Sequence, residues 1–271
     1  MTCCRHLGAL SAVPFLFALT ASSPVGAAER ASSSLRVEDL TWPEIDSAIK
    51  SGKTIAIVMA GSTEEGGPHM ALGKHNVIAR YVGERVAREL GNALVYPVMP
   101  FAPTGDPEKK SDLMEFPGTV SISDQTFGAV AHDVARSAIA AGFKNVVLAG
   151  EHGGGQATLK DVARRLDAQW SPKGIHVYFA DYKEADRRIA DYCKEHGLPI
   201  GEHAGIQDTP KLMYLDPDHR WVRTDKMAPG GKWEDTGVDG DPTRSTAELG
   251  KIFLDFEVQS LVDEIRAVVP R

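Results

Sequence analysis

The chain has 271 residues, of which 42% are hydrophobic and 25% are charged. These proportions are ordinary for a soluble globular protein. With 30 Lys and Arg residues against 37 Asp and Glu residues, the formal net charge is -7, and the sequence contains no basic stripe. Overall charge repulsion therefore argues against nucleic acid or an anionic membrane surface as a partner.

The N-terminal segment resembles a secretory signal peptide. Arg5 and His6 precede a short apolar run over residues 7–20, and small residues continue to Ala28. A charged start, a short apolar segment and a small-residue end are the features of such a peptide. A transmembrane helix needs about 20 apolar residues, so an uncleaved anchor is the weaker alternative. We expect a signal peptide over residues 1–27 and a periplasmic or secreted protein without a membrane segment over residues 28–271.

After residue 28, short apolar runs alternate with amphipathic stretches. The apolar runs predict strands over residues 54–59, 93–98, 145–149 and 175–180. The amphipathic stretches predict helices over residues 76–90, 124–141, 182–196 and 247–268, and another between Gly155 and about Trp170. Asp124 is the expected N-cap of its helix. This alternation predicts one α/β domain with a mainly parallel sheet and helices on both faces.

Two long segments fit neither pattern. Residues 97–117 contain five prolines, and residues 227–245 are rich in Gly, Pro and Asp. Loops of this length are usually functional or disordered, and ligands of α/β sheets bind beyond the carboxyl ends of the strands. Each segment is therefore expected either to border a site or to be a plain surface excursion.

Acidic and imidazole side chains gather in three glycine-containing segments. They are Glu64, His69 and His75 in residues 61–76, Glu151 and His152 in residues 151–155, and Glu202 and His203 in residues 201–205. Two of the segments begin where a predicted strand ends, so they can converge on one cleft. Carboxylate and neutral imidazole bind divalent zinc or manganese, and three protein ligands leave a position open for water. A phosphate-binding loop over residues 150–155 is the alternative, but the Walker ending and the G-x-G-x-x-G spacing are missing.

The order of these motifs resembles that of the creatininase (creatinine amidohydrolase) family. That family carries G-S-x-E-x-H-G-P-H-L-P-L-G-T-D after a strand, followed by F-P-G-T, N-G-H-G-G-N and H-A-G motifs. The matching residues of this chain follow in the same order: 61–64, 67–69, 72–73, 116–119, 152–154 and 202–205. Residues 237–242 are similar to the family's closing loop. The resemblance covers roughly residues 40–268.

Members of that family have a three-layer α/β/α fold, often form homohexamers, and hydrolyse cyclic or linear amide C–N bonds at a centre of one or two metal ions. The resemblance implies the same fold and a homo-oligomer, by analogy a hexamer, for this chain. Residue by residue, Glu64 matches the family's first metal-binding Glu, and His152 matches its metal-binding His. Glu202 and His203 match the catalytic Glu–His pair.

Three departures change what the resemblance implies for the metal. Gly66 stands where the second metal-binding His would be, and His75 replaces the bridging Asp. Gly154 stands where creatininase itself has a metal-binding Glu, although many relatives also have Gly. A neutral imidazole bridges two cations poorly, because it offers one facing nitrogen and no negative charge. We therefore expect one divalent ion, zinc rather than manganese, held by Glu64, His75 and His152, with a metal-free pocket as the alternative.

The remaining residues are assigned by the same matching. We expect His203 to act as the general acid/base that protonates the leaving nitrogen, with Glu202 orienting it. His69 is expected to line the substrate pocket or to support the site from behind, and Trp233 is expected to contact substrate. Weaker candidates are Glu65 and Asp208 for a further metal ligand, and Asp235 and Arg244 for substrate contact.

These residues predict an exported metal-dependent hydrolase that cleaves an amide bond of a small molecule, most simply a cyclic amide, through a metal-activated water. The altered metal ligands argue against creatinine itself as the substrate. Two other functions stay open. One is a non-catalytic binding or scaffold protein of the same fold, and the other is a metal-dependent lactonase or isomerase.

Overall fold

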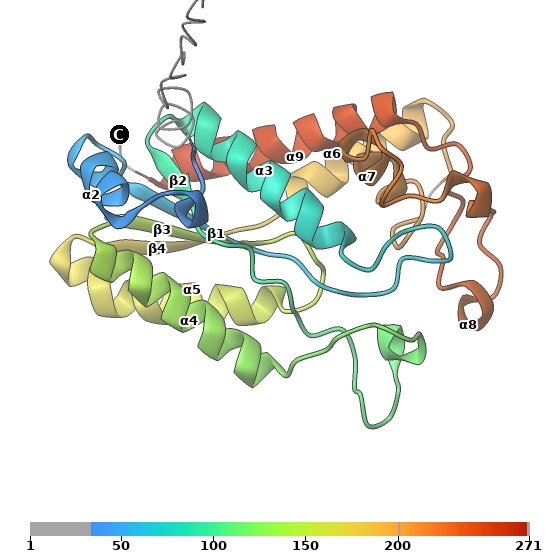
Figure 1. The fold of residues 1–271 in the computed structure, drawn as a ribbon, viewed down its shortest axis with the longest axis horizontal. Helices are drawn as coiled ribbons and strands as arrows, with labels where there is room; N and C mark the ends of the chain where they lie inside the picture. The colour runs from blue at the N-terminus through green and yellow to red at the C-terminus, as the bar shows by residue number, and fades with distance from the viewer. Residues whose placement is uncertain (1–33, 200, 270–271) are drawn as a thin grey trace, which may run out of the picture. The chain divides into compact units, whose positions relative to one another are not determined.

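Four parallel strands form the centre of the fold, in the order β2-β1-β3-β4 (Figure 1). Their bounds are Ile55–Ala60 for β1, Ala93–Val95 for β2, Asn145–Gly150 for β3 and His176–Ala180 for β4. The computed structural model describes residues 34–199 and 201–269. The signal peptide predicted over residues 1–27 lies outside the described residues.

The sequence of the strands explains why they lie in the middle. None of the four described strands contains Lys, Arg, Asp or Glu, and every residue of β1 and β3 is buried. Strands of a parallel sheet that are buried on both faces read as continuous apolar runs. β1 pairs with both neighbours from Ile55 onward, opposite Ala93 of β2 and Asn145 of β3.

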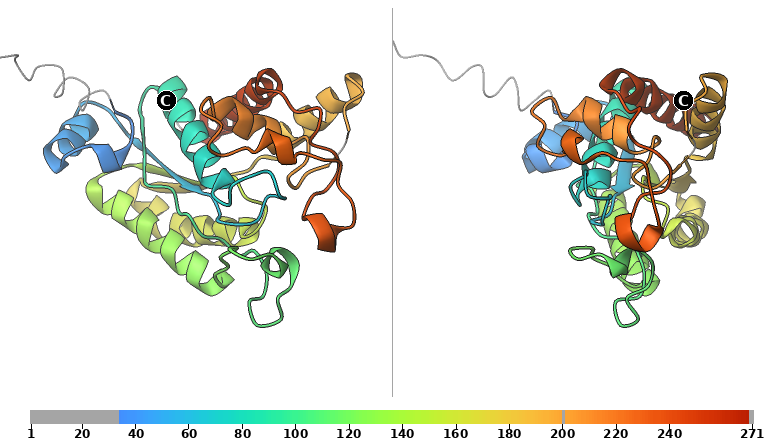
Figure 2. Two further views of the ribbon diagram at one scale, coloured as in Figure 1. Left: turned by 45° about the vertical axis from the view of Figure 1, so that its right-hand side comes forward. Right: turned by 90° about the vertical axis from the view of Figure 1, so that its right-hand side faces the viewer.

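Helices cover both faces of this sheet, as Figures 1 and 2 show. Helices α3 (Lys74–Leu90) and α9 (Ala247–Val268) pack on one face, with α6 (Lys183–Glu195) and α7 (Thr209–Leu215) against α9. Helices α4 (Asp124–Ala141) and α5 (Gln156–Trp170) pack on the other face. The predicted three-layer α/β/α fold with a parallel sheet is confirmed.

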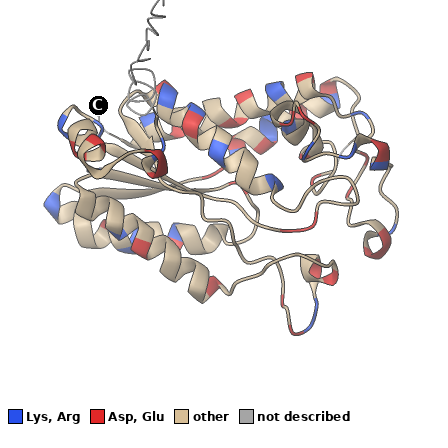
Figure 3. Cartoon of the chain, in the orientation of Figure 1, with Lys and Arg blue, Asp and Glu red and all other residues tan. Residues whose placement is uncertain are grey.

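Two apolar clusters hold the layers together, one on each face of the sheet. Alternate residues of β1 divide between them, because successive strand side chains point to opposite faces. Ile57 packs with α3 and α9, and Val58 packs with α4 and α5. The charged residues lie along the helices and loops, while the strands between the layers are free of them (Figure 3).

Most predicted bounds agree with the structure to within two residues, and two predictions need correction. The strand expected over residues 93–98 ends at Val95, because one extra residue breaks the register: Tyr96 donates to the Ile57 carbonyl, and the next bond to β1 comes from Met99 to Met59 instead of from Val98. The N-cap of α4 is Ser123 rather than Asp124, since the Ser123 hydroxyl accepts the Thr126 amide hydrogen.

Several short elements were not expected from the sequence. They are α2 (Trp42–Lys50), α7, the short α8 (Trp233–Thr236) and the 3₁₀ turns η1 (Val37–Asp39), η2 (Asp112–Glu115), η3 (Ser171–Lys173) and η4 (Thr224–Lys226). In the part of the chain that the structure describes, no helix is long and apolar enough to cross a membrane.

Candidate metal centre

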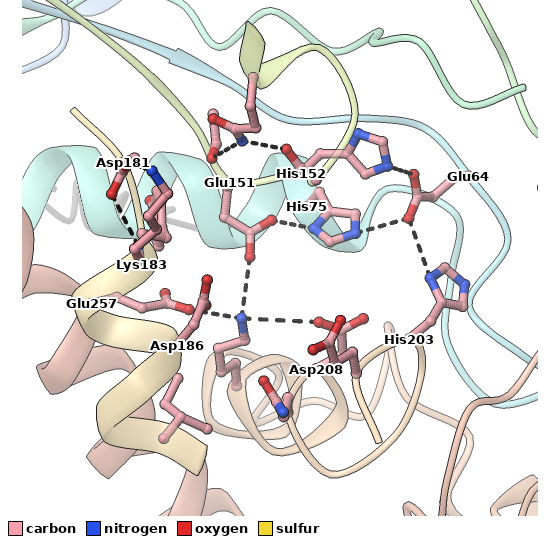
Figure 4. Close-up of a pocket in the computed structure, with 18 of the residues that line it drawn as sticks. Glu64, His75, Glu151, His152, Asp181, Lys183, Asp186, His203, Asp208 and Glu257 are labelled. Carbon is pink, nitrogen blue, oxygen red and sulfur yellow. Dashed lines mark hydrogen bonds and ion pairs between the residues drawn. The ribbon is translucent and has the colours of Figure 1, made fainter. Parts of the chain in front are cut away.

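Three side chains meet beyond the carboxyl ends of the two central strands (Figure 4). Glu64 lies on the segment after β1, His152 on the segment after β3, and His75 in the first turn of α3. One ligand atom from each lies within 4.8 Å of the others, and all three residues are buried. The structure therefore brings together the three residues predicted as metal ligands.

The Glu64 carboxylate is the centre of this group. Its Oε2 atom lies 2.6 Å from Nε2 of His152 and accepts a hydrogen bond of 2.8 Å from Ser62. Its Oε1 atom lies 2.9 Å from Nε2 of His75. Burial alone would raise the pKa of Glu64, but His75, Lys74 and His152 lower this pKa well below the usual range of a carboxyl group. Glu64 is thus an anion at any physiological pH.

His75 is held from behind by Glu151. Its Nδ1 atom makes a short contact with Oε2 of Glu151. A carboxylate at one ring nitrogen fixes the tautomer and turns the lone pair of the other nitrogen toward the metal position. Sequence reasoning placed Glu151 beside His152 but gave it no role. The signal was its position in the same glycine-rich segment that carries a proposed ligand.

His152 is arranged differently. Its Nδ1 atom accepts a hydrogen bond of 3.0 Å from the Gly154 amide, so the proton of the neutral ring is on Nε2, which lies 2.6 Å from Oε2 of Glu64. Binding of a metal ion at Nε2 requires the ring proton to move to Nδ1, which displaces the Gly154 amide from that nitrogen. Two ligands at about 2.1 Å from a tetrahedral ion lie about 3.4 Å apart, so opening the present contacts by less than about 1 Å gives coordination distances. The donor set of one carboxylate and two imidazoles fits one divalent ion.

Lys74 is a further buried residue of this centre, and the sequence gave it no role. Its side chain is fully buried. Its Nζ atom lies 2.9 Å from Oε1 of Glu64, 3.2 Å from Oδ2 of Asp208 and 2.7 Å from Nε2 of His75. Burial lowers the pKa of Lys74, but Asp208 and Glu64 more than offset this effect and raise the pKa. Three acceptors thus surround an ammonium group.

The His203 imidazole lies opposite the predicted ligands, with a different partner from the one expected. Its Nδ1 atom is 3.8 Å from Oε1 of Glu64, and its Nε2 atom is 2.6 Å from Oε1 of Glu65. Glu202, the expected orienting partner, is exposed, and its amide donates to Asp239 at 3.1 Å. In this structure Glu65 rather than Glu202 is therefore the carboxylate beside His203, a pairing that no sequence spacing indicated.

The two predicted substrate-contacting residues lie in different surroundings. His69 is fully buried, and its Nε2 atom contacts the Thr209 hydroxyl at 2.9 Å, so it supports the site from behind. Trp233 packs edge-on against His203, with ring centroids 5.4 Å apart, and against Phe116 at 5.9 Å. Phe116 and Trp233 belong to the two long segments for which the sequence left two alternatives open, a border of the site or a plain surface excursion, and both segments reach the site.

Two cavities open beside these residues, and both are lined by Glu202 and His203. The larger has a volume of about 550 Å³, and its wall includes Glu64, His75 and His152. The smaller has a volume of about 460 Å³, and its wall includes Trp233. Among the described residues, seven carboxylates and three lysines line the larger cavity. Its wall is therefore acidic overall.

Lys211, also in the wall of the larger cavity, joins two of these carboxylates. Its Nζ atom lies 2.7 Å from Oε1 of Glu257 and 3.3 Å from Oε1 of Glu151. Burial raises the pKa of Glu257 to about 7, with the Glu151 carboxylate adding to the rise and Lys211 opposing it. This network links the back of His75 to helix α9.

Comparison with known proteins agrees with this architecture. The sequence model of the family described as creatinine amidohydrolase matches residues 38–265. The chain belongs to the creatininase family. It is therefore a metal-dependent amidohydrolase by descent, although its sequence has diverged far from those of its characterised relatives.

The creatinine amidohydrolase of Pseudomonas putida is 25% identical over 265 residues, which cover 88% of this chain and 99% of that relative. The mycofactocin precursor peptide peptidase of Mycolicibacterium smegmatis is 26% identical over 243 residues, covering 80% and 86%. Among solved structures, a mutant creatininase of the Zn–Zn type has a TM-score of 0.76 at 22% identity, covering 88% of this chain and all of that one. A structure described as creatininase Mn has a TM-score of 0.74 at 23% identity, with 88% and 100% coverage.

Packing around Gly154 explains one departure from the creatininase pattern. A Cβ atom at this position would lie 2.0 Å from the Pro103 carbonyl oxygen and 2.7 Å from the His152 ring. A side chain, and so a metal-binding Glu, has no room at Gly154 with this backbone. The segment that carries Pro103 belongs to the first of the two long loops, which thereby closes one side of the centre.

Proposed function

We propose that this chain hydrolyses an amide C–N bond of a small molecule at a centre of one divalent ion, zinc rather than manganese. Glu64, His75 and His152 hold the ion. The observation that carries the proposal is the convergence of these three buried side chains on one wall of a cavity that His203 also lines. Family membership supports amide hydrolysis as the reaction.

When bound, the ion polarises the substrate carbonyl and lowers the pKa of a water molecule, which is the attacking group. The protein residues position the ligand atoms and supply the proton. Glu64 and His75 are fixed by Ser62 and Glu151, so the ligand atoms are held in place before an ion arrives. His203 holds a proton for the leaving nitrogen at Nδ1, which faces the centre, while its Nε2 atom lies beside Glu65.

The shape and charge of the cavity define the substrate class. A volume of about 550 Å³ is in the usual range for small-molecule sites. The majority of carboxylates in its wall disfavours an anionic substrate and favours a neutral or cationic one. We propose a cyclic amide with a polar or basic substituent, seated with one face near Trp233.

A short peptide is the second candidate substrate. The two cavities share Glu202 and His203, so a longer ligand passing His203 would reach both of them. The similarity to a mycofactocin precursor peptide peptidase supports this candidate. Cyclic amide and peptide substrates have the same scissile bond, and they differ in how much of the second cavity they fill.

We further propose that the protein is exported after cleavage near residue 27 and assembles as a homo-oligomer. The charged, apolar and small-residue pattern of the N-terminal segment supports export. The assembly follows from the family resemblance alone. N-terminal sequencing of protein from the periplasm or medium tests the first proposal, and light scattering of the purified protein tests the second.

The central test combines metal analysis with a substrate panel. Purified protein is assayed for zinc and manganese and against cyclic amides, short peptides, lactones and keto sugars. We expect amide hydrolysis that chelator abolishes and zinc restores. Glu64→Ala and His152→Ala should lose both metal and activity, while His196→Ala, at an exposed histidine, should keep both.

Two outcomes would contradict the proposal. A folded, metal-free protein whose behaviour is unchanged by Glu64→Ala and His152→Ala would be a binding or scaffold protein of the same fold. Turnover of lactones or keto sugars without any turnover of amides would assign a different reaction to the same centre.

A further inference from the structure

Lys74 brings a positive charge into the middle of the predicted metal ligands. Its side chain is fully buried, and its Nζ atom is within 3.2 Å of Glu64, Asp208 and His75. The Nζ atom also lies 2.7 Å from Nε2 of His75, so its N–H groups turn to Glu64 and Asp208 when that nitrogen binds the ion. Two carboxylates and one imidazole lone pair are the kind of donor set that also surrounds a divalent cation.

The stem of Lys74 runs past Gly66. A Cβ atom at Gly66 would lie 3.2 Å from both Cδ and Cε of Lys74 and 3.0 Å from Cβ of Met70. In the motif that this chain resembles, position 66 is the second metal-binding His and position 74 is Thr. Side chains at positions 66 and 74 thus compete for the same space, and here the lysine fills it.

The other contacts that a second ion would need are also taken. Gly154 has no room for a side chain, because the Pro103 carbonyl closes over it. At the position of the bridging Asp, His75 offers only Nε2 to the centre, because Nδ1 contacts Glu151, so it can bind one ion and cannot bridge to a second. The Lys74 ammonium lies 2.9 Å from Oε1 of Glu64, while His152 lies on the side of Oε2, so the ammonium already neutralises the oxygen that a second ion would need.

We propose that the Lys74 ammonium is a built-in cation that takes the place of a second divalent ion, so that the centre binds one ion only. This inference rests on the proposed metal centre and deepens it. The ammonium supplies one positive charge and three N–H donors, which compensate and orient Glu64 and Asp208. Lys74 lies behind the cavity wall rather than on it, so it positions the ligands and does not touch substrate.

The test counts zinc ions per chain in the purified full-length protein at saturating zinc, by elemental analysis after removal of free metal. Three variants are compared with the wild type: Lys74→Ala, the double variant Gly66→His with Lys74→Ala, and Lys160→Ala as a control at an exposed lysine of the same cavity. We expect one ion in the wild type and in Lys160→Ala, and two ions in both variants that lack Lys74. The double variant should hold its second ion more tightly than Lys74→Ala, by about tenfold or more, because it regains an imidazole ligand.

The difference in zinc ions per chain between the wild type and Lys74→Ala tests this inference separately from the proposed function. A wild type without zinc, beside a Lys74→Ala variant with one ion, would refute the proposed metal centre and still support the built-in cation. Equal counts in the wild type and in Lys74→Ala would overturn the inference. If Lys74→Ala unfolds without metal, it is refolded in excess zinc before the count. The wild type also tests the inference by itself, because two ions bound with Lys74 intact would refute it.

Discussion

The Nε2 atom of His203 lies 2.6 Å from Oε1 of Glu65, whereas the neighbouring Glu202 is exposed. The carboxylate that follows the proposed metal ligand Glu64 in the sequence is therefore the one that lies beside the proposed general acid. A single segment after β1 serves both halves of the site. It carries the proposed metal ligand Glu64 and, on the next residue, the carboxylate that lies beside the His203 imidazole.

Glu65→Gln should lower kcat for amide hydrolysis by roughly 10- to 100-fold, part of the 10²–10⁴ that general acid–base catalysis contributes. The amide keeps the size of the side chain but not the charge that stabilises the His203 imidazolium. Glu202→Gln is the matched control, and its kcat for amide hydrolysis should differ from that of the wild type by less than about threefold. The zinc content of both variants should equal that of the wild type. An equal or larger loss in Glu202→Gln would restore Glu202 as the orienting partner.

Glu151→Gln should weaken zinc binding by about 10- to 100-fold, because outer-shell carboxylates raise the basicity of a metal-binding histidine and fix its orientation. Glu151 contacts Nδ1 of His75, and Glu64 and His152 are left in place. Asp181→Asn, at another carboxylate of the cavity wall, is the control. Competition titration with a zinc chelator measures the affinities. Unchanged affinity in Glu151→Gln would mean that His75 is not a ligand.

Gly154→Ala should destabilise the protein by about 1–3 kcal/mol, the usual range for overpacking. The added methyl group would meet the Pro103 carbonyl oxygen at 2.0 Å, and backbone cannot rotate away as a flexible side chain can. Gly153→Ala is the control, since a Cβ atom there meets nothing within 4 Å. Urea unfolding of both variants gives the difference. Equal unfolding midpoints would show that the loop carrying Pro103 moves aside freely.

Glu257 should make the free energy of unfolding fall as the pH rises from about 4.5 to about 7. Its folded-state pKa is about 7, above the ordinary value of 4.5, so the folded protein binds the proton more strongly than the unfolded chain. This contribution is complete below pH 4.5 and is lost as the pH rises through 7. At about 1.4 kcal/mol per pKa unit it is at most about 3 kcal/mol.

Glu257→Gln should flatten this part of the stability profile, while Glu248→Gln, at an exposed carboxylate of the same helix, should leave it unchanged. Urea unfolding at several pH values between 4.5 and 8 measures both. If the free energy of unfolding of Glu257→Gln changed with pH in the same way as that of the wild type, the pH dependence would not come from Glu257.

The sheet and its long helices could be predicted because each has a strong local pattern. β1 and β3 are continuous apolar runs, and α9 begins and ends where its amphipathic pattern does. Helix α2 was missed although its signals are present, since Thr41 and Glu44 form a capping box and Pro43 stands in the first turn. Its nine residues are too few for an apolar pattern to reveal on its own.

The three predicted metal ligands meet because the ends of parallel strands share one edge of the sheet. Contacts between distant segments could not be predicted in the same way. The approach of Glu65 to His203 depends on how the segment after residue 200 packs back onto the first loop, and no local pattern records that. The role of Lys74 was hidden as well, although its signal was the joint presence of Lys at position 74 and Gly at position 66.

Anomalous diffraction at the zinc edge from crystals of the zinc-saturated protein tests the central claim most directly. We predict a single strong peak per chain within bonding distance of Glu64, His75 and His152, with the Lys74 side chain still buried between Glu64 and Asp208. Two peaks in the centre, or no peak beside these three residues, would contradict it.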